Sequence, residues 1–204
     1  MAHSAYAATV KPSKLASASL RLAGWQYEGD VPTEKKAVCL AVPHTSNWDG
    51  VLLVTLLRSI GLEMEWMLKD TWMKGPLRPA MQKLGAVGID RSHATHVVDQ
   101  MVEQFRLRDR FLLGIPPEGT RGRAEFWKSG FYHIALGARV PVIPGYLDYG
   151  RKRAGLGAPI VLSGDVRADM DAIRAYYAKT KPTPYDPSKF GPIRLREESA
   201  PPSS

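Results

Sequence analysis

A histidine and an aspartate lie five residues apart in this chain, at His44 and Asp49. A neutral imidazole has an ordinary pKa of about 6.5, so it accepts a proton from a hydroxyl group near neutral pH, and a neighbouring carboxylate stabilises the imidazolium that results. The pair has the chemistry of a general base that makes a hydroxyl nucleophilic. The alternative is purely structural, because a helix-capping aspartate beside a hydrogen-bonded histidine is a common arrangement.

The residues around this pair predict a strand, a turn and a helix. The apolar run 37–42 is typical of a buried strand that Pro43 ends, and a helix is predicted over residues 48–60. Residues five apart on one continuous helix point about 140° away from each other. Contact therefore requires His44 in the turn and Asp49 near the start of the helix. His44 then lies at the carboxyl end of a strand, which is where open α/β sheets bind ligands.

A second candidate segment, residues 116–121, follows the apolar run 110–115. Its prolines end a predicted strand, and Gly119 permits the backbone to approach a ligand closely. Thr120 and Arg121 supply a hydroxyl and a forked cation that suit phosphate or carboxylate. An ordinary surface turn is the alternative for this segment.

Two shorter segments complete the pattern. A strand predicted over residues 86–89 leads to Arg91, at the start of a helix predicted over residues 93–108. Exposed amides, the helix dipole and a guanidinium then form an anion site, with a solvated ion pair to Asp90 as the alternative. The run 140–144, which reads Val-Pro-Val-Ile-Pro, predicts a short edge or bent strand.

In their order along the chain, these four segments resemble the sequence blocks of the glycerophospholipid acyltransferase family, best known for lysophosphatidate (1-acyl-glycerol-3-phosphate) acyltransferases. The matching blocks are residues 44–49, 88–91, 117–121 and 140–144, and the resemblance covers about residues 25–165. It implies a glycerol-3-phosphate acyltransferase-like α/β fold, with a single domain and a mixed, mostly parallel sheet covered by helices. The alternation of predicted strands and helices favours the same fold class.

The resemblance also implies roles for particular residues. His44 is the general base and Asp49 its orienting partner, in transfer of a fatty acyl group from acyl-CoA or acyl carrier protein to a lysophospholipid hydroxyl. The positions that match the family's acceptor-binding residues are Arg91, Glu118, Gly119, Thr120 and Arg121. Lys128, just after the third block, is a further candidate for the phosphate, or else a surface lysine. A thioester is already activated, so neither a covalent enzyme intermediate nor a cofactor is expected.

Three departures from the family pattern concern the acceptor. Pro43 stands where Asn is frequent, Gly88 where a bulky Phe is usual, and Gly122 where Ser is common. Lysophosphatidate, which would give phosphatidate in phospholipid biosynthesis, is the first expectation, and a lysolipid without glycerol phosphate, such as an amino-acid lysolipid, is the alternative. A non-catalytic lipid-binding protein of the same fold and a hydrolase using the same base stay open as well.

The charge balance indicates an anionic partner, since the net charge of the 204-residue chain is +8. Nucleic acid is not expected, because the basic residues are scattered and no nucleic-acid-binding motif is present. A metal site is not expected either, because His93 and His96 have no further ligands at suitable spacing. The anionic partners that remain are an acidic lipid surface and a phosphorylated substrate.

Membrane attachment is expected to be peripheral, because no apolar run approaches the roughly 20 residues that span a bilayer. Residues 11–25 interleave basic and apolar side chains, which is typical of an interfacial helix, with a helix packed on the domain as the alternative. The single Cys39 in a predicted buried strand, and the lack of a signal-like apolar core, favour the cytoplasmic side of a membrane.

The remaining pattern predicts one domain over residues 11–180, with a disordered N-terminus at 1–10 and a Pro-rich, thinly structured tail at 181–204. Further strands are expected near residues 64–68 and 159–162. Further helices are expected near residues 15–23, 128–137 and 167–179.

Overall fold

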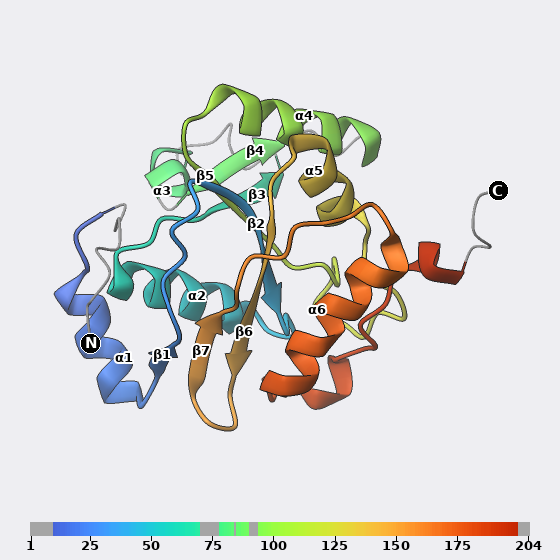
Figure 1. Cartoon of the computed structure of the whole chain (residues 1–204). Helices are drawn as coiled ribbons and strands as arrows, with labels where there is room; N and C mark the ends of the chain where they lie inside the picture. Colours follow the sequence, from blue (N-terminus) through green and yellow to red (C-terminus); the bar gives the residue numbers. More distant parts are fainter. Residues whose placement is uncertain (1–9, 70–77, 84, 90–93, 200–204) are drawn as a thin grey trace, which may run out of the picture.

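A computed structural model describes residues 10–69, 78–83, 85–89 and 94–199 of the chain. Among these residues, one sheet of seven strands has the order β1-β7-β6-β2-β5-β3-β4. Neighbouring strands are parallel except for β6 and β7, which are antiparallel. Helices cover both faces of the sheet (Figure 1). The predicted fold class, a mixed and mostly parallel α/β sheet covered by helices, is confirmed.

The bounds of the elements are as follows. The strands are β1 (Gln26–Glu28), β2 (Lys36–Val42), β3 (Glu65–Lys69), β4 (Ala86–Ile89), β5 (Phe111–Ile115), β6 (Val142–Asp148) and β7 (Arg153–Leu156). The helices are α1 (Lys14–Ala23), α2 (Asn47–Ile60), α3 (Arg78–Lys83), α4 (Ala94–Leu107), α5 (Gly130–Ala138) and α6 (Val166–Thr180), followed by the 3-10 helices η2 (Pro187–Lys189) and η3 (Arg196–Ser199).

Strand β2 lies at the centre of the fold, and its side chains alternate between two apolar clusters. Val38, Leu40 and Val42 pack into the cluster that contains residues of α4, α5 and α6. Ala37 and Cys39 face the other side, in the cluster that contains residues of α2. A strand buried on both faces reads as a continuous apolar run rather than an alternating one. This explains the sequence of β2.

Most predicted elements agree with the structure to within about two residues at each end, which is the usual uncertainty of an element boundary. The strand predicted over residues 159–162 is wrong, because Ile160 makes only an isolated bridge to Val142. The prediction missed β1, β7 and α3, which are 3, 4 and 6 residues long. Elements this short carry too little periodicity to be recognised from sequence.

The residues that follow α6 pack against the domain. Their regular structure consists of η2 and η3, but Leu195 is buried and forms an isolated bridge with Trp127. The Trp127 amide donates to the carbonyl of Arg194 at 2.8 Å. The Pro-rich composition of this segment predicts little secondary structure, and it does not reveal that the segment contacts the loops at the edge of the sheet.

Helix α1 packs on α2 and is amphipathic. Ser13 caps its start and Gly24, with a φ of 79°, ends it. Ala16 and Leu20 are buried against the domain, whereas the apolar side chains of Leu15 and Leu22 are exposed. None of the helices in the described part of the chain is long and apolar enough to cross a bilayer.

Candidate active site

Three neighbouring parallel strands bring the candidate residues to one edge of the sheet. In the order β6-β2-β5, Val42 of β2 lies opposite Tyr146 of β6, and Leu40 lies opposite Ile115 of β5. The chain continues from these strands into His44, Glu118 and Tyr149. Their carboxyl ends therefore surround the turn after β2, with one neighbouring strand on each side.

His44 lies in the turn after β2, and Asp49 lies in the first turn of α2, as the sequence predicts. The His44 Nδ1 atom is 3.6 Å from Asp49 Oδ2, which is an ion-pair distance somewhat longer than a hydrogen bond. Because Nδ1 faces the carboxylate, Nε2 is the nitrogen placed to exchange a proton with a substrate.

Asp49 makes the helix-capping contacts of the structural alternative and also faces the His44 imidazole. Its side chain is buried, and its Oδ2 accepts hydrogen bonds from the backbone amides of Thr45 at 2.7 Å and Ser46 at 2.8 Å. The second of these bonds closes a capping box with the Ser46 side chain at the start of α2. Asp49 Oδ1 accepts a third hydrogen bond, from the Tyr149 hydroxyl at 2.6 Å.

His44 is held in the neutral, proton-accepting form. Its side chain is 21% exposed, and burial lowers the pKa of the imidazole. The negative charge of Asp49 acts in the opposite direction, and the positive charge of Arg121 lowers the pKa further. A histidine with a lowered pKa is neutral at pH 7, which is the state that a general base requires.

Glu118 lies in the protein interior directly beside the His44 turn. It is 3% exposed, and its Oε1 accepts a hydrogen bond from the backbone amide of His44 at 3.1 Å. Its other oxygen is buried with no hydrogen-bond partner among the described residues. Burial raises the pKa of Glu118 to about 7. These contacts support a role in positioning His44, whereas the sequence resemblance places Glu118 among the acceptor-binding residues.

The loop after Glu118 exposes a hydroxyl and two cations that are candidates for the acceptor, together with Arg123. Gly119 has a φ of 67°, and a Cβ at this position would lie 2.8 Å from Lys128 Cγ, so the Lys128 side chain runs directly against the glycine. The Lys128 amide donates to the Pro117 carbonyl at 2.7 Å, which joins the two ends of the loop. Thr120, Arg121 and Lys128 are exposed. Thr120 Oγ1 accepts the Gly122 amide at 3.1 Å.

Arg91, the remaining candidate for the acceptor phosphate, lies outside the described residues, as does His93. Within the described part of the chain, no group of three or more His, Cys, Asp and Glu side chains is arranged to hold a metal ion. The sequence did not identify Tyr149 as part of the site. Its place just after β6, on the strand next to β2, is the signal that would have indicated it.

Comparisons with known proteins show to which family the chain belongs. The sequence model of the Acyltransferase family matches residues 25–148, which is more than half of the chain. The chain belongs to the Acyltransferase family. The fold of this acyltransferase is similar to that of the 1-acyl-sn-glycerophosphate (LPA) acyltransferase PlsC from Thermotoga maritima, with a TM-score of 0.59 and 16% identity. The similarity covers 85% of this chain and 79% of the other. A comparison with curated proteins finds no match.

The region that matches the family contains the acyltransferase's His44 turn, the start of α2 and the loop from Glu118 to Lys128. It ends at residue 148, immediately before Tyr149, and does not include the segment that follows α6. The family description therefore covers most of the candidate residues. It does not cover the residue that donates to Asp49 Oδ1.

Proposed function

We propose that this acyltransferase transfers a fatty acyl group from the thioester of acyl-CoA or acyl carrier protein to the hydroxyl of a lysophospholipid. The acceptor that fits best is 1-acyl-glycerol-3-phosphate, which would be converted to phosphatidate in phospholipid biosynthesis. The observation that carries the proposal is His44 itself: a partly buried imidazole with a lowered pKa, ion-paired through Nδ1 to a buried carboxylate. Two exposed cations, Arg121 and Lys128, lie on the loop beside it.

The geometry of the site supports the following reaction. The acceptor hydroxyl gives its proton to His44 Nε2 as its oxygen attacks the thioester carbonyl carbon. The new C–O bond produces a tetrahedral oxyanion, which collapses by breaking the C–S bond. The imidazolium returns the proton to the departing thiolate. Asp49 stabilises the imidazolium during this cycle. No enzyme-bound acyl intermediate is needed, because the acceptor oxygen attacks the activated thioester directly.

The acceptor's charge indicates where it binds. A phosphate monoester head group is anionic and accepts several hydrogen bonds, which suits the guanidinium of Arg121, the ammonium of Lys128 and the hydroxyl of Thr120. Arg91 stays a prediction for the same phosphate. The structural similarity to a protein named as an LPA acyltransferase supports lysophosphatidate as the acceptor.

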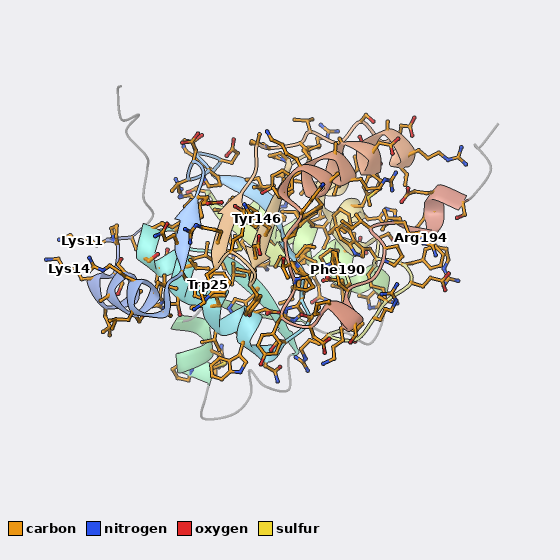
Figure 2. All side chains as sticks on the ribbon, turned by 90° about the horizontal axis from the view of Figure 1, so that it is seen from below. Lys11, Lys14, Trp25, Tyr146, Phe190 and Arg194 are labelled. Carbon is orange, nitrogen blue, oxygen red and sulfur yellow. The ribbon has the colours of Figure 1, made fainter. Side chains whose placement is uncertain are left out.

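A peripheral position on the inner, cytoplasmic face of a membrane is part of the proposal. Leu15 is 81% and Leu22 is 91% exposed on α1. Lys11 and Lys14 point outward from the same end of the molecule (Figure 2). Apolar side chains beside cations match the boundary between acyl chains and anionic head groups. This placement would bring a lipid acceptor to the enzyme.

The proposal is tested by thin-layer chromatography of products from purified protein, labelled acyl-CoA and a panel of lysolipids led by lysophosphatidate. A parallel series uses acyl carrier protein as the donor. Labelled phosphatidate from the wild type and not from His44→Ala is the expected result. Labelled free fatty acid without acylated lipid would indicate a hydrolase instead. No product with either donor and any acceptor would contradict acyl transfer to lysolipids.

A further inference from the structure

Tyr149 completes the set of hydrogen bonds to the Asp49 carboxylate. It follows β6 directly, in the turn that leads to β7. Its hydroxyl donates to Asp49 Oδ1 at 2.6 Å, on the carboxylate oxygen opposite the one that faces His44. Burial, together with the hydrogen bond to Asp49, raises the pKa of Tyr149, so the hydroxyl keeps its proton and remains a donor.

The ring of Tyr149 is fixed from two sides. Trp25, at the end of α1, meets it edge-on with ring centroids 5.1 Å apart. Tyr185, in the segment after α6, meets it edge-on with centroids 5.2 Å apart. In each contact the two ring planes are nearly perpendicular, and together the contacts restrict rotation of the Tyr149 ring. The hydroxyl is thereby aimed at Asp49 rather than left to rotate in solvent.

Two hydrogen bonds donated by backbone amides connect the segment after α6 to both sides of the site. The Tyr149 amide donates to the carbonyl of Thr183 at 2.8 Å. The Asp186 amide donates to the hydroxyl oxygen of Thr45, inside the His44 turn, at 3.2 Å. Residues 183–186 therefore bridge the turn after β6 and the turn after β2.

We propose that Tyr149 is a positioning residue of the His44–Asp49 pair, and that residues 183–186 hold it in place. The inference rests on the proposed function, in which His44 is the general base. Asp49 Oδ2 is fixed by the amides of Thr45 and Ser46, and Tyr149 fixes Oδ1, so the plane of the carboxylate is determined at both oxygens. This orientation sets the position of Asp49 Oδ2 relative to His44 Nδ1.

The hydrogen bond also adjusts the charge that His44 experiences. Among the described residues, the charged or titratable groups around the turn include Asp49 on α2, Arg121 and Glu118 after β5, Tyr149 after β6 and Asp186 after α6. Donation from the Tyr149 hydroxyl draws part of the carboxylate's negative charge away from Oδ2. Without it, more of that charge faces His44, which stabilises the imidazolium and raises the pKa of His44.

The test compares Tyr149→Phe with Tyr132→Phe. Tyr132 donates to another buried carboxylate, Asp169, at 2.8 Å, so the control removes the same kind of hydrogen bond between α5 and α6. Carbon-detected NMR titration of histidine-labelled full-length protein gives the pKa of His44, assigned by the resonance missing from His44→Ala. Initial rates with lysophosphatidate and acyl-CoA give kcat and KM for the same samples.

Tyr149→Phe is expected to raise the pKa of His44 by about half a unit or more and to lower kcat about tenfold or more, with KM nearly unchanged. Tyr132→Phe is expected to change none of these. Tyr185→Ala, at a half-exposed ring, should move both quantities partway in the direction of Tyr149→Phe. It also carries the test if Tyr149→Phe does not fold.

An unchanged His44 pKa or an unchanged kcat in Tyr149→Phe would overturn the inference, provided that His44→Ala is inactive. Full activity of His44→Ala would instead overturn the proposed function, because it would remove the histidine from the mechanism. The two failures are therefore distinguishable. An equal response in Tyr132→Phe would show that the effect comes from general loss of stability, and it too would overturn the inference.

Discussion

Burial has opposite consequences for the pKa values of His44 and of Glu118, which lies beside the His44 turn. It disfavours the charged form of each group, so it lowers the pKa of His44 and raises the pKa of Glu118 to about 7. The histidine is therefore ready to accept a proton at neutral pH, while Glu118 is only partly ionised. A partly neutral Glu118 adds little negative charge beside Asp49, which keeps the two acidic side chains compatible.

Glu118 should make folding stability depend on pH. The pKa of Glu118 is higher in the folded protein than the value of about 4.5 in the unfolded chain, so ionisation above that value favours unfolding. The wild type should gain about 2 kcal/mol relative to Glu118→Gln as the pH falls from 8 to 5. Urea unfolding of both proteins across this range measures the difference. A constant difference would contradict the raised pKa of Glu118.

Arg121 should contribute to binding of the acceptor more than to the chemical step. A lost charge-assisted hydrogen bond costs about 1.5 to 3 kcal/mol, so Arg121→Ala should raise KM for lysophosphatidate about tenfold or more. Arg106→Ala is the matched control, because Arg106 is an exposed arginine that pairs with Glu103 on α4. Equal KM values for Arg121→Ala and the wild type would remove Arg121 from the acceptor site.

At the scale of elements, the segment after α6 contacts the loop from Glu118 to Lys128 as well as Tyr149. A Cβ at Gly191 would lie 1.9 Å from the carbonyl oxygen of Ala124, so only glycine fits there. Arg123 also donates to the carbonyl of Phe190 at 2.7 Å. These two contacts fix the loop that contains Arg121, and the segment that makes them lies outside the matched family region. Phe190 and Arg194 of this segment lie well away from Lys11 and Lys14 (Figure 2).

Gly191→Ala should accordingly displace this contact. The clash is expected to lower the free energy of unfolding by about 1 to 3 kcal/mol and to raise KM for the acceptor, because the loop loses its support. Gly130→Ala is the control, since a Cβ at Gly130 meets nothing within 4 Å. Thermal unfolding and acceptor kinetics measure both effects. Equal behaviour of the two variants would show that the segment does not support the loop.

The elements that could be predicted from sequence are those with long, regular patterns. The run 36–42 and the helix after it stood out because both faces of the strand are buried and Ser46 and Gly61 mark the ends of the helix. The approach of His44 to Asp49 could be predicted because the strand end, the turn and the start of α2 were all recognisable from sequence. The contacts of Tyr149 and of residues 183–186 could not, because they join segments far apart in the chain through single hydrogen bonds.

At the scale of the whole molecule, the proposed contact with a membrane rests on the net charge of +8 and on the exposed apolar side chains of α1. The double variant Leu15→Glu/Leu22→Glu should co-sediment several-fold less with vesicles that contain anionic phospholipid. Both changes remove apolar contact with the membrane, and both add a negative charge that the anionic lipid repels. Binding of the wild type should also weaken with added salt.

The control for this prediction is the double variant Leu107→Glu/Val161→Glu. The two residues it replaces are exposed and apolar, and they lie outside α1. The control adds the same charge to the protein, so a change that depends only on net charge would affect both double variants equally. Equal loss of vesicle binding in the two variants would contradict a membrane-contacting role for α1.

The most direct test of the account is the turnover number of His44→Ala with acyl-CoA and lysophosphatidate, measured on protein shown to be folded by its unfolding transition. General-base catalysis contributes about 10²- to 10⁴-fold, so kcat should fall by at least the lower of these factors. Lysolipid binding should persist, because the proposed acceptor contacts lie on the loop after Glu118. A folded His44→Ala protein that turns over at the wild-type rate would contradict the proposed mechanism.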